Sequence, residues 1–167
     1  MNKNNVLIPV DGAAFSLQIL PCIRRFLNPS ENHLILLRVE PEPEAIHIHQ
    51  AGFGDIDIYV DETEASLRSN FADELLPTVR ALKELGFTVT TKVEFGEPIS
   101  ELEAYIAGQA VDLVAMTTHG RMGLNRILHG SIAEHLLHHV DVPILLLHPL
   151  SQQRNRKRVK AQVAPLG

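Results

Sequence analysis

A glycine-punctuated stretch from Thr117 to Ser131 has the residue types of a phosphate-binding loop. Gly120 and Gly130 allow the backbone to turn sharply and to approach a ligand closely. Ser131 and Glu134 stand three residues apart, which is the spacing of a capping box at the start of a helix. The free N–H groups and the dipole of a helix start favour an anion. We therefore expect this stretch to hold phosphate groups, although Gly130 and Ser131 would also serve as a simple helix cap.

Two better-known phosphate motifs are excluded by the residues present. A Walker A loop ends in Gly-Lys-Ser/Thr, whereas His129 precedes the Gly130-Ser131 pair here. A dinucleotide-binding fingerprint follows the first strand as Gly-x-Gly-x-x-Gly, and the corresponding residues from Asp11 onward read DGAAFS. We therefore expect the phosphates to be held after the fourth strand and not after the first.

An acidic residue, Asp11, follows the first expected strand. Ligands of open α/β sheets bind at the carboxyl ends of the strands, so Asp11 would lie beside the glycine loop. A carboxylate there suits a hydrogen bond to a ribose hydroxyl or an adenine amino group, and could hold a metal ion on the phosphates. An Asp-Gly pair also forms turns readily, and both interpretations stay open.

Hydrophobic patterning predicts the elements that must position these residues. Apolar or alternating runs indicate five strands, at residues 6–10, 34–39, 87–93, 111–116 and 142–147. Apolar residues at helical spacing indicate helices at 16–27, 62–85, 98–110 and 131–139. Pro21 and Pro77 fall inside the first two helical patterns. Pro77 predicts a kink, and Pro21 predicts a kink or a shortened helix. The alternation of strands and helices predicts an α/β fold with one parallel sheet covered by helices on both faces.

The chain is expected to contain one domain, residues 1–149, followed by a basic and disordered tail, residues 150–167. Within the domain, residues 41–61 are interpreted as an irregular insertion loop. The net charge is −5 although the tail is basic, so the body is acidic, which argues against nucleic acid as a ligand. The single cysteine, Cys22, suits a reducing compartment, and no apolar run is long enough to cross a bilayer. We expect a soluble, cytoplasmic protein.

Histidines are the other residues that suggest chemistry. His47 and His49 alternate with isoleucines, and His135 and His139 share a helix face at a spacing that can bind zinc. No carboxylate or cysteine ligand accompanies either pair in the sequence, so no metal site is predicted. No general base is evident beside the expected phosphates, so no catalytic residue is assigned.

Several segments resemble the universal stress protein family, in order and in spacing, over residues 5 to 148. The matching runs are VLIPVDG from Val6, LLRV ending at Val39, GRMGL from Gly120, LHGSIAE from Leu128 and VPILLL from Val142. The nucleotide-binding branch of that family shows Gly-x2-Gly-x9-Gly-Ser/Thr. Gly120, Gly130 and Ser131 fit this pattern, and Thr117 stands at its first glycine.

The resemblance implies a flavodoxin-like, Rossmann-like open sheet of five parallel strands and an adenine nucleotide as ligand: ATP, or AMP or ADP, with Mg²⁺ or Mn²⁺. The residues that it assigns to nucleotide binding are Pro9, Val10, Asp11, Val39, Met116, Thr117, Gly120, Arg121, Gly130, Ser131 and Ile132. It also implies a homodimer through the last strand, Val142 to Leu147, and a protein partner that responds to the nucleotide.

Three functions compete at this point. The first is a nucleotide-binding regulator of a stress response. The second is a slow metal-dependent ATPase or phosphotransferase that uses Asp11. The third is a response-regulator receiver, which needs an Asp after the third strand and a Lys after the fifth; the sequence has Glu94 and His148 there, which disfavours it.

Overall fold

The computed structural model describes residues 3–11, 16–42, 46–50, 54–58, 64–117 and 131–147, and for residues 46–50, 54–58, 64 and 131 it describes the backbone alone. The strands are β1 (Asn4–Pro9), β2 (Asn32–Glu40), β3 (Ile46–Gln50), β4 (Gly54–Ile58), β5 (Thr88–Phe95), β6 (Leu113–Thr117) and β7 (Ile144–Leu147). The helices are the short 3-10 helix η1 (Ser16–Ile19), α1 (Leu20–Phe26), α2 (Glu64–Glu74), α3 (Leu76–Glu84), α4 (Pro98–Gly108) and α5 (Ser131–His139).

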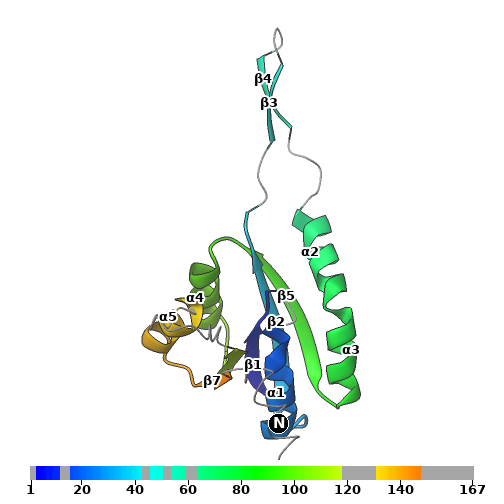
Figure 1. Cartoon of the computed structure of the whole chain (residues 1–167), viewed down its shortest axis with the longest axis vertical. Coiled ribbons are helices and arrows are strands. Elements are labelled where there is room, and N and C mark those ends of the chain that lie inside the picture. Colours follow the sequence, from blue (N-terminus) through cyan, green and yellow to red (C-terminus); the bar gives the residue numbers. More distant parts are fainter. Residues whose placement is uncertain are drawn as a thin grey trace, which may run out of the picture.

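Five of these strands form a parallel sheet in the order β5-β2-β1-β6-β7. Helices α1 and α3 pack on one face of the sheet, and α4 and α5 pack on the other (Figure 1). This arrangement confirms the predicted α/β fold with one parallel sheet between two helical layers.

The side chains of the central strand β1 divide between the two layers. Val6 and Ile8 are fully buried against the layer of α1 and α3, whereas Leu7 is fully buried against the layer of α4 and α5. A strand that is covered on both faces has a continuous apolar sequence instead of an alternating one. β1 therefore lies in the middle of the sheet, and Asp11 follows shortly after its end.

Both prolines lie in the first turn of a helix and kink neither, but α1 is short, which is the other outcome predicted from Pro21. Pro21 lies in the first turn of α1, after η1, and Pro77 lies in the first turn of α3. Proline is tolerated there because its missing N–H group has no partner within the helix. The single kinked helix predicted over 62–85 is therefore two helices, α2 and α3, which meet at the buried residue Leu75.

Residues 46–50 and 54–58 pair as the two strands of an antiparallel hairpin, so the prediction of an irregular loop over 41–61 is wrong for these residues. The hairpin pairs β3 with β4, from Ile46 opposite Ile58 to Gln50 opposite Gly54. Isoleucines alternate with polar residues in both strands, IHIHQ and GDIDI, and this is the period of a β-strand. The hairpin forms a sheet of its own, which stands apart from the five-stranded sheet in Figure 1.

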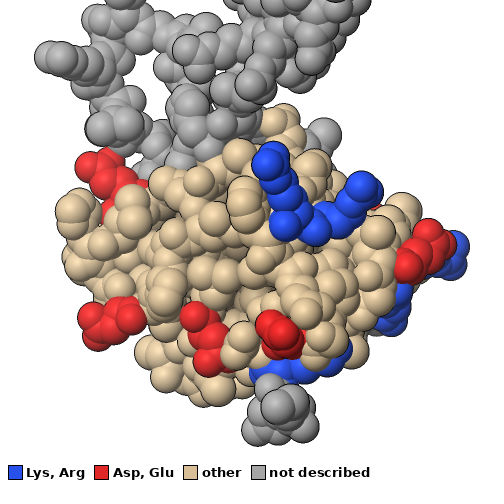
Figure 2. Space-filling view, turned by 90° about the horizontal axis from the view of Figure 1, so that it is seen from below, with Lys and Arg blue, Asp and Glu red and all other residues tan. Residues whose placement is uncertain are grey.

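The edge of the sheet at which the parallel strands begin is shown in Figure 2. Basic and acidic side chains are scattered over an otherwise uncharged surface in that view. Among the helices described by the structure, none is long and apolar enough to cross a membrane.

Candidate functional site

The order of the strands reverses at β1, which has β2 on one side and β6 on the other. The ladder between β1 and β6 ends where Leu7 pairs with Val114. Beyond that pair, β1 stays bonded to β2 through the N–H group of Val10, and β6 stays paired with β7 as far as Thr117. The two halves of the sheet therefore lose their mutual pairing at their carboxyl ends, where open α/β sheets bind ligands.

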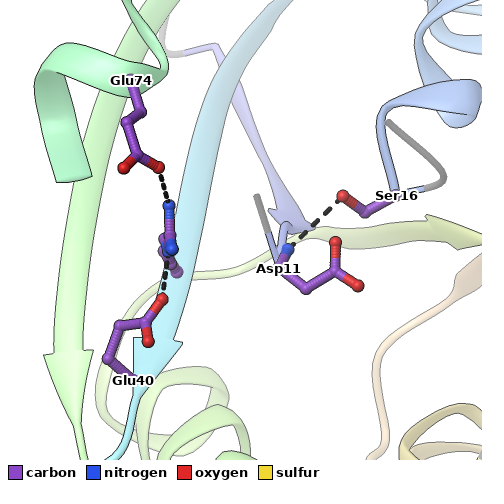
Figure 3. Close-up of polar contacts among 5 residues, drawn as sticks. Asp11, Ser16, Glu40 and Glu74 are labelled. Carbon is purple, nitrogen blue, oxygen red and sulfur yellow. Dashed lines mark hydrogen bonds and ion pairs between the residues drawn. The ribbon is translucent and has the colours of Figure 1, made fainter. Parts of the chain in front are cut away.

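The carboxyl end of β1 combines a buried apolar residue with an exposed acid. Val10 is 5% exposed, and its N–H group donates to the carbonyl oxygen of Leu37 at 2.9 Å. Asp11 follows and is exposed. Its backbone N–H group donates to the hydroxyl of the buried Ser16 at 3.4 Å, and the two residues face each other (Figure 3). Asp11 is therefore an exposed acid at the carboxyl edge of the sheet.

Three more of the predicted site residues share one apolar cluster. Met116 near the end of β6 is buried, and Val39 of β2 and Ile132 of α5 pack against the same cluster. Thr117 ends β6 and is half-buried. The backbone of α5 begins at Ser131, as predicted, and Ile132 brings the first turn of this helix against the cluster that contains Met116.

The structure brings together part of the predicted site. Pro9 and Asp11 at the end of β1, Val39 on β2 and Thr117 on β6 all lie at the carboxyl ends of neighbouring strands. Gly120, Arg121 and Gly130 lie outside the described residues, as does the basic tail 150–167. The assignment of the glycine loop to phosphate stays a prediction.

Arg38, next to Val39, is a buried charged residue to which sequence analysis assigned no role. Its guanidinium contacts the carboxylates of Glu40 and Glu74, from β2 and α2, and lies 4.2 Å from the centre of the Phe71 ring. In Figure 3, the carboxylates of Glu40 and Glu74 approach the guanidinium from opposite sides. Arg38 was recognisable in the sequence as the one charged residue in an otherwise apolar run.

The charge of Arg38 is favoured by these contacts. Burial disfavours the charged form, but the hydrogen bonds and charges of Glu74 and Glu40 outweigh it and raise the pKa of the guanidinium. Arg38 faces α2, whereas Val39 packs toward α4 and α5. Arg38 therefore attaches α2 to β2 and does not itself line the predicted nucleotide site.

The comparison with protein families gives a match over nearly all of the domain. The model of the universal stress protein family matches residues 3–148. Universal stress protein MJ0577 of Methanocaldococcus jannaschii is 25% identical over an aligned length of 150 residues, and the alignment covers 85% of this chain and 93% of that protein.

Solved structures show the same fold. A structure of protein MJ0577 has a TM-score of 0.64 at 23% identity and covers 91% of this chain and 100% of that chain. A universal stress protein family protein from Arabidopsis thaliana with AMP bound has a TM-score of 0.60 at 14% identity, over 90% and 94% of the two chains. A universal stress protein in complex with cAMP has a TM-score of 0.58 at 16% identity, over 89% and 98%.

Proposed function

Because this chain belongs to the universal stress protein family, we propose that it binds an adenine nucleotide at the carboxyl edge of its sheet and regulates a stress response. The observation that carries the proposal is the end of the β1–β6 ladder at Leu7 and Val114. Past that point the exposed carboxylate of Asp11 and the half-buried Thr117 stand at the ends of the two parting strands.

In this proposal the two ends of the nucleotide are held by different chemistry. Pro9, Val10 and Asp11 receive the adenosine together with Val39, by backbone contacts and by the carboxylate of Asp11. The phosphates lie on the glycine loop, the start of α5 and the end of β6. The residues proposed for the phosphates are Thr117, Gly120, Arg121, Gly130, Ser131 and Ile132, and Met116 is proposed to contact the nucleotide beside them.

The polar groups of the site suit a nucleotide better than an apolar ligand. Helix starts attract anions through their free N–H groups and the helix dipole, and the first turn of α5 packs through Ile132 against the cluster that contains Met116. Asp11 offers a hard oxygen ligand, so Mg²⁺ or Mn²⁺ would be held between Asp11 and the phosphates. The ion would neutralise phosphate charge that would otherwise lie beside an acid.

Two solved relatives support the class of ligand, since one is described with AMP bound and the other in complex with cAMP. Both ligands contain adenosine, and they differ in how the phosphate is attached. They support an adenine nucleotide in general, and ATP is our specific proposal because the predicted loop from Gly120 to Gly130 is long enough to surround several phosphates.

We further propose a cytoplasmic homodimer that pairs through β7, with a protein partner that recognises the nucleotide-bound form. β7 is the last strand in the order of the sheet, and Leu146 on it is 38% exposed. A short apolar edge strand can pair with a second copy of itself, which covers its free backbone groups.

The second candidate function is slow, metal-dependent hydrolysis or transfer of phosphate. The observation that favours it is the exposed carboxylate of Asp11 beside the proposed phosphate site. Sustained release of phosphate from ATP in the presence of Mg²⁺ or Mn²⁺, abolished by Asp11→Ala, would support it. If ATP is bound and released many times without hydrolysis, this second function is excluded and the regulatory function stands.

The experiment that tests the proposed ligand needs no assumption about its identity. The freshly purified protein is denatured, and the released small molecules are identified by mass spectrometry and counted per chain. We expect an adenine nucleotide in a fixed proportion to protein, and a Gly130→Val variant that carries much less of it. A preparation that releases none and takes up none when ATP is supplied would contradict the proposal.

A further inference from the structure

Two histidines of α5 and one glutamate of α4 form a compact cluster at the surface, apart from the proposed nucleotide site. His135 and His139 are one helical turn apart, and their rings are stacked with centres 3.9 Å apart and planes 6° apart. Nε2 of His135 lies 2.8 Å from Oε1 of Glu103. Each residue offers one potential ligand atom, and these atoms lie within 4.8 Å of one another.

In this cluster Glu103 supplies the third potential metal ligand, which the sequence did not reveal. The i, i+4 spacing of His135 and His139 is suited to zinc, but a structural or catalytic zinc ion needs at least three protein ligands. Glu103 is 32 residues away in the sequence and comes to His135 only because α4 packs against α5. Two imidazoles and a carboxylate form a common set of ligands for Zn²⁺.

The hydrogen bond of His139 leaves its second ring nitrogen available for a metal ion. Its Nδ1 lies 2.8 Å from the carbonyl oxygen of His135, and a carbonyl can only accept, so Nδ1 carries the proton and donates. Nε2 of His139 then keeps its lone pair. In metal sites the second ring nitrogen of a ligating histidine is held in this way by a carbonyl or a carboxylate.

Packing beneath the cluster holds the two helices together while the ligands stay accessible. Leu102 and Leu136, the neighbours of Glu103 and His135 in the sequence, are 2% and 0% exposed in one apolar cluster. The side chains of Glu103 and His135 are 36% and 31% exposed. An ion can therefore enter from solvent without opening the core.

Binding of an ion requires the more distant of the ligand atoms, which all lie within 4.8 Å of one another, to move closer together. A tetrahedral ion with bonds of about 2.0–2.2 Å separates its ligand atoms by roughly 3.4 Å. The pair of His135 and Glu103 would open slightly from 2.8 Å, and the exposed His139 would turn toward the ion. The contact of Glu103 with His135 and the hydrogen bond of His139 to the carbonyl of His135 would also hold these side chains together without an ion, so the test must detect the bound ion itself.

We propose that Glu103, His135 and His139 bind a divalent transition-metal ion, with Zn²⁺ as the first candidate, at the surface where α4 meets α5. Water or a group from another molecule would complete the coordination. The nitrogen and oxygen ligands favour Zn²⁺, Ni²⁺ or Cu²⁺ over Mg²⁺ or Ca²⁺. This site is independent of the proposed nucleotide site, and its test does not depend on nucleotide binding.

The test is a competitive titration of the untagged, chelator-treated full chain with Zn²⁺ and a chromogenic indicator. We expect one Zn²⁺ per chain at this site. His139→Gln and Glu103→Gln should each weaken binding at least about 100-fold, since each removes a ligand and not an outer-shell partner, whose loss costs about 10–100-fold. His138→Gln, an exposed neighbour on the same helix, is the matched control and should leave the affinity unchanged.

A second readout keeps the proposal testable if a variant folds poorly. In NMR spectra of the wild-type chain, Zn²⁺ should shift the ring signals of His135 and His139 and leave those of His138 in place. The proposal is overturned if the chain binds no Zn²⁺, if the signals of His138 shift equally, or if His138→Gln weakens binding as much as His139→Gln. Binding that is lost in a variant lacking His47 and His49, and kept in His139→Gln, would also overturn it.

Discussion

Asn5 and Asp112 hold the starts of β1 and β6 together by a pair of reciprocal hydrogen bonds. The N–H group of Asn5 donates to Oδ2 of Asp112 at 2.7 Å, and the N–H group of Asp112 donates to the carbonyl oxygen of Asn5 at 2.9 Å. The side chain of Asn5 also donates to the carbonyl of Ala110 at 2.7 Å. These two strands are therefore joined at their starts and part before their ends.

The Asp112→Ala variant should be less stable by about 1 kcal/mol, because it removes one net hydrogen bond at a partly exposed site. The measurement is the free energy of unfolding from denaturant titration. Asp141→Ala changes an equally exposed acid in the turn before β7 and should shift the stability by less than about 0.5 kcal/mol. Equal effects of the two substitutions would show that Asp112 does not fasten the strands.

Arg38 should contribute more to stability than its acidic partners do separately. Arg38→Met keeps the length of the side chain but leaves Glu40 without its partner and removes the contact with Phe71, so we expect a loss of about 2 kcal/mol. Glu74→Gln changes a side chain that is 58% exposed and should cost less than about 1 kcal/mol. A comparable loss in both variants, measured by denaturant unfolding, would contradict this account.

Local patterns in the sequence predicted much of the sheet. The apolar runs at residues 6–10 and 34–39 correspond to β1 and β2. They could be recognised because a parallel strand that is buried on both faces has a continuous apolar sequence. Gly86 follows the C-cap of α3, and its φ of 91° is a conformation that suits glycine.

What the sequence did not reveal depends on contacts between distant residues. The alternation of IHIHQ was visible, but it identifies a hairpin only when paired with GDIDI, and the turn residues around it suggested a loop. The partner of His135 is Glu103, and the partner of Arg38 on α2 is Glu74, 36 residues away. No periodicity predicts which helix faces which, so these pairs needed the structure.

The start of α4 should make stability depend on pH. Glu97 caps this helix, and the hydrogen bond from the backbone N–H group of Ser100 is the main cause that holds the pKa of Glu97 below its ordinary value. A pKa that is lowered by folding adds stability above the unfolded-state pKa of about 4.3, and this is lost as the pH falls through the folded-state pKa.

Thermal midpoints measured from pH 7 to pH 3 test this effect. Glu97→Ala should unfold at a lower temperature than the wild type at pH 7, and the gap should narrow as the pH falls below about 4.3. The difference between Glu97→Gln and Glu97→Ala should stay constant, since neither side chain titrates. A wild-type advantage that is the same at every pH would refute the role of the carboxylate.

The proposed dimer can be tested on its edge strand. Leu146→Lys places a charge on β7, where lysine discourages pairing between edges, so the variant should shift toward the monomer in size-exclusion chromatography with light scattering. Leu85→Lys is the control, because Leu85 is 41% exposed against 38% for Leu146 but lies in the turn after α3. A monomeric wild type, or dissociation by both variants, would rule out pairing through β7.

The central claim is that the glycine loop and the carboxyl ends of β1 and β6 hold an adenine nucleotide, and calorimetric titration with ATP tests it most directly. Gly130→Val would place a side chain where we expect the phosphates, whereas Gly108→Val adds the same side chain at a glycine with open space around it. We predict that the wild type and Gly108→Val bind ATP alike and that Gly130→Val binds at least about tenfold more weakly, a loss of about 1.4 kcal/mol. Equal binding by all three proteins, or no binding by the wild type, would contradict the claim.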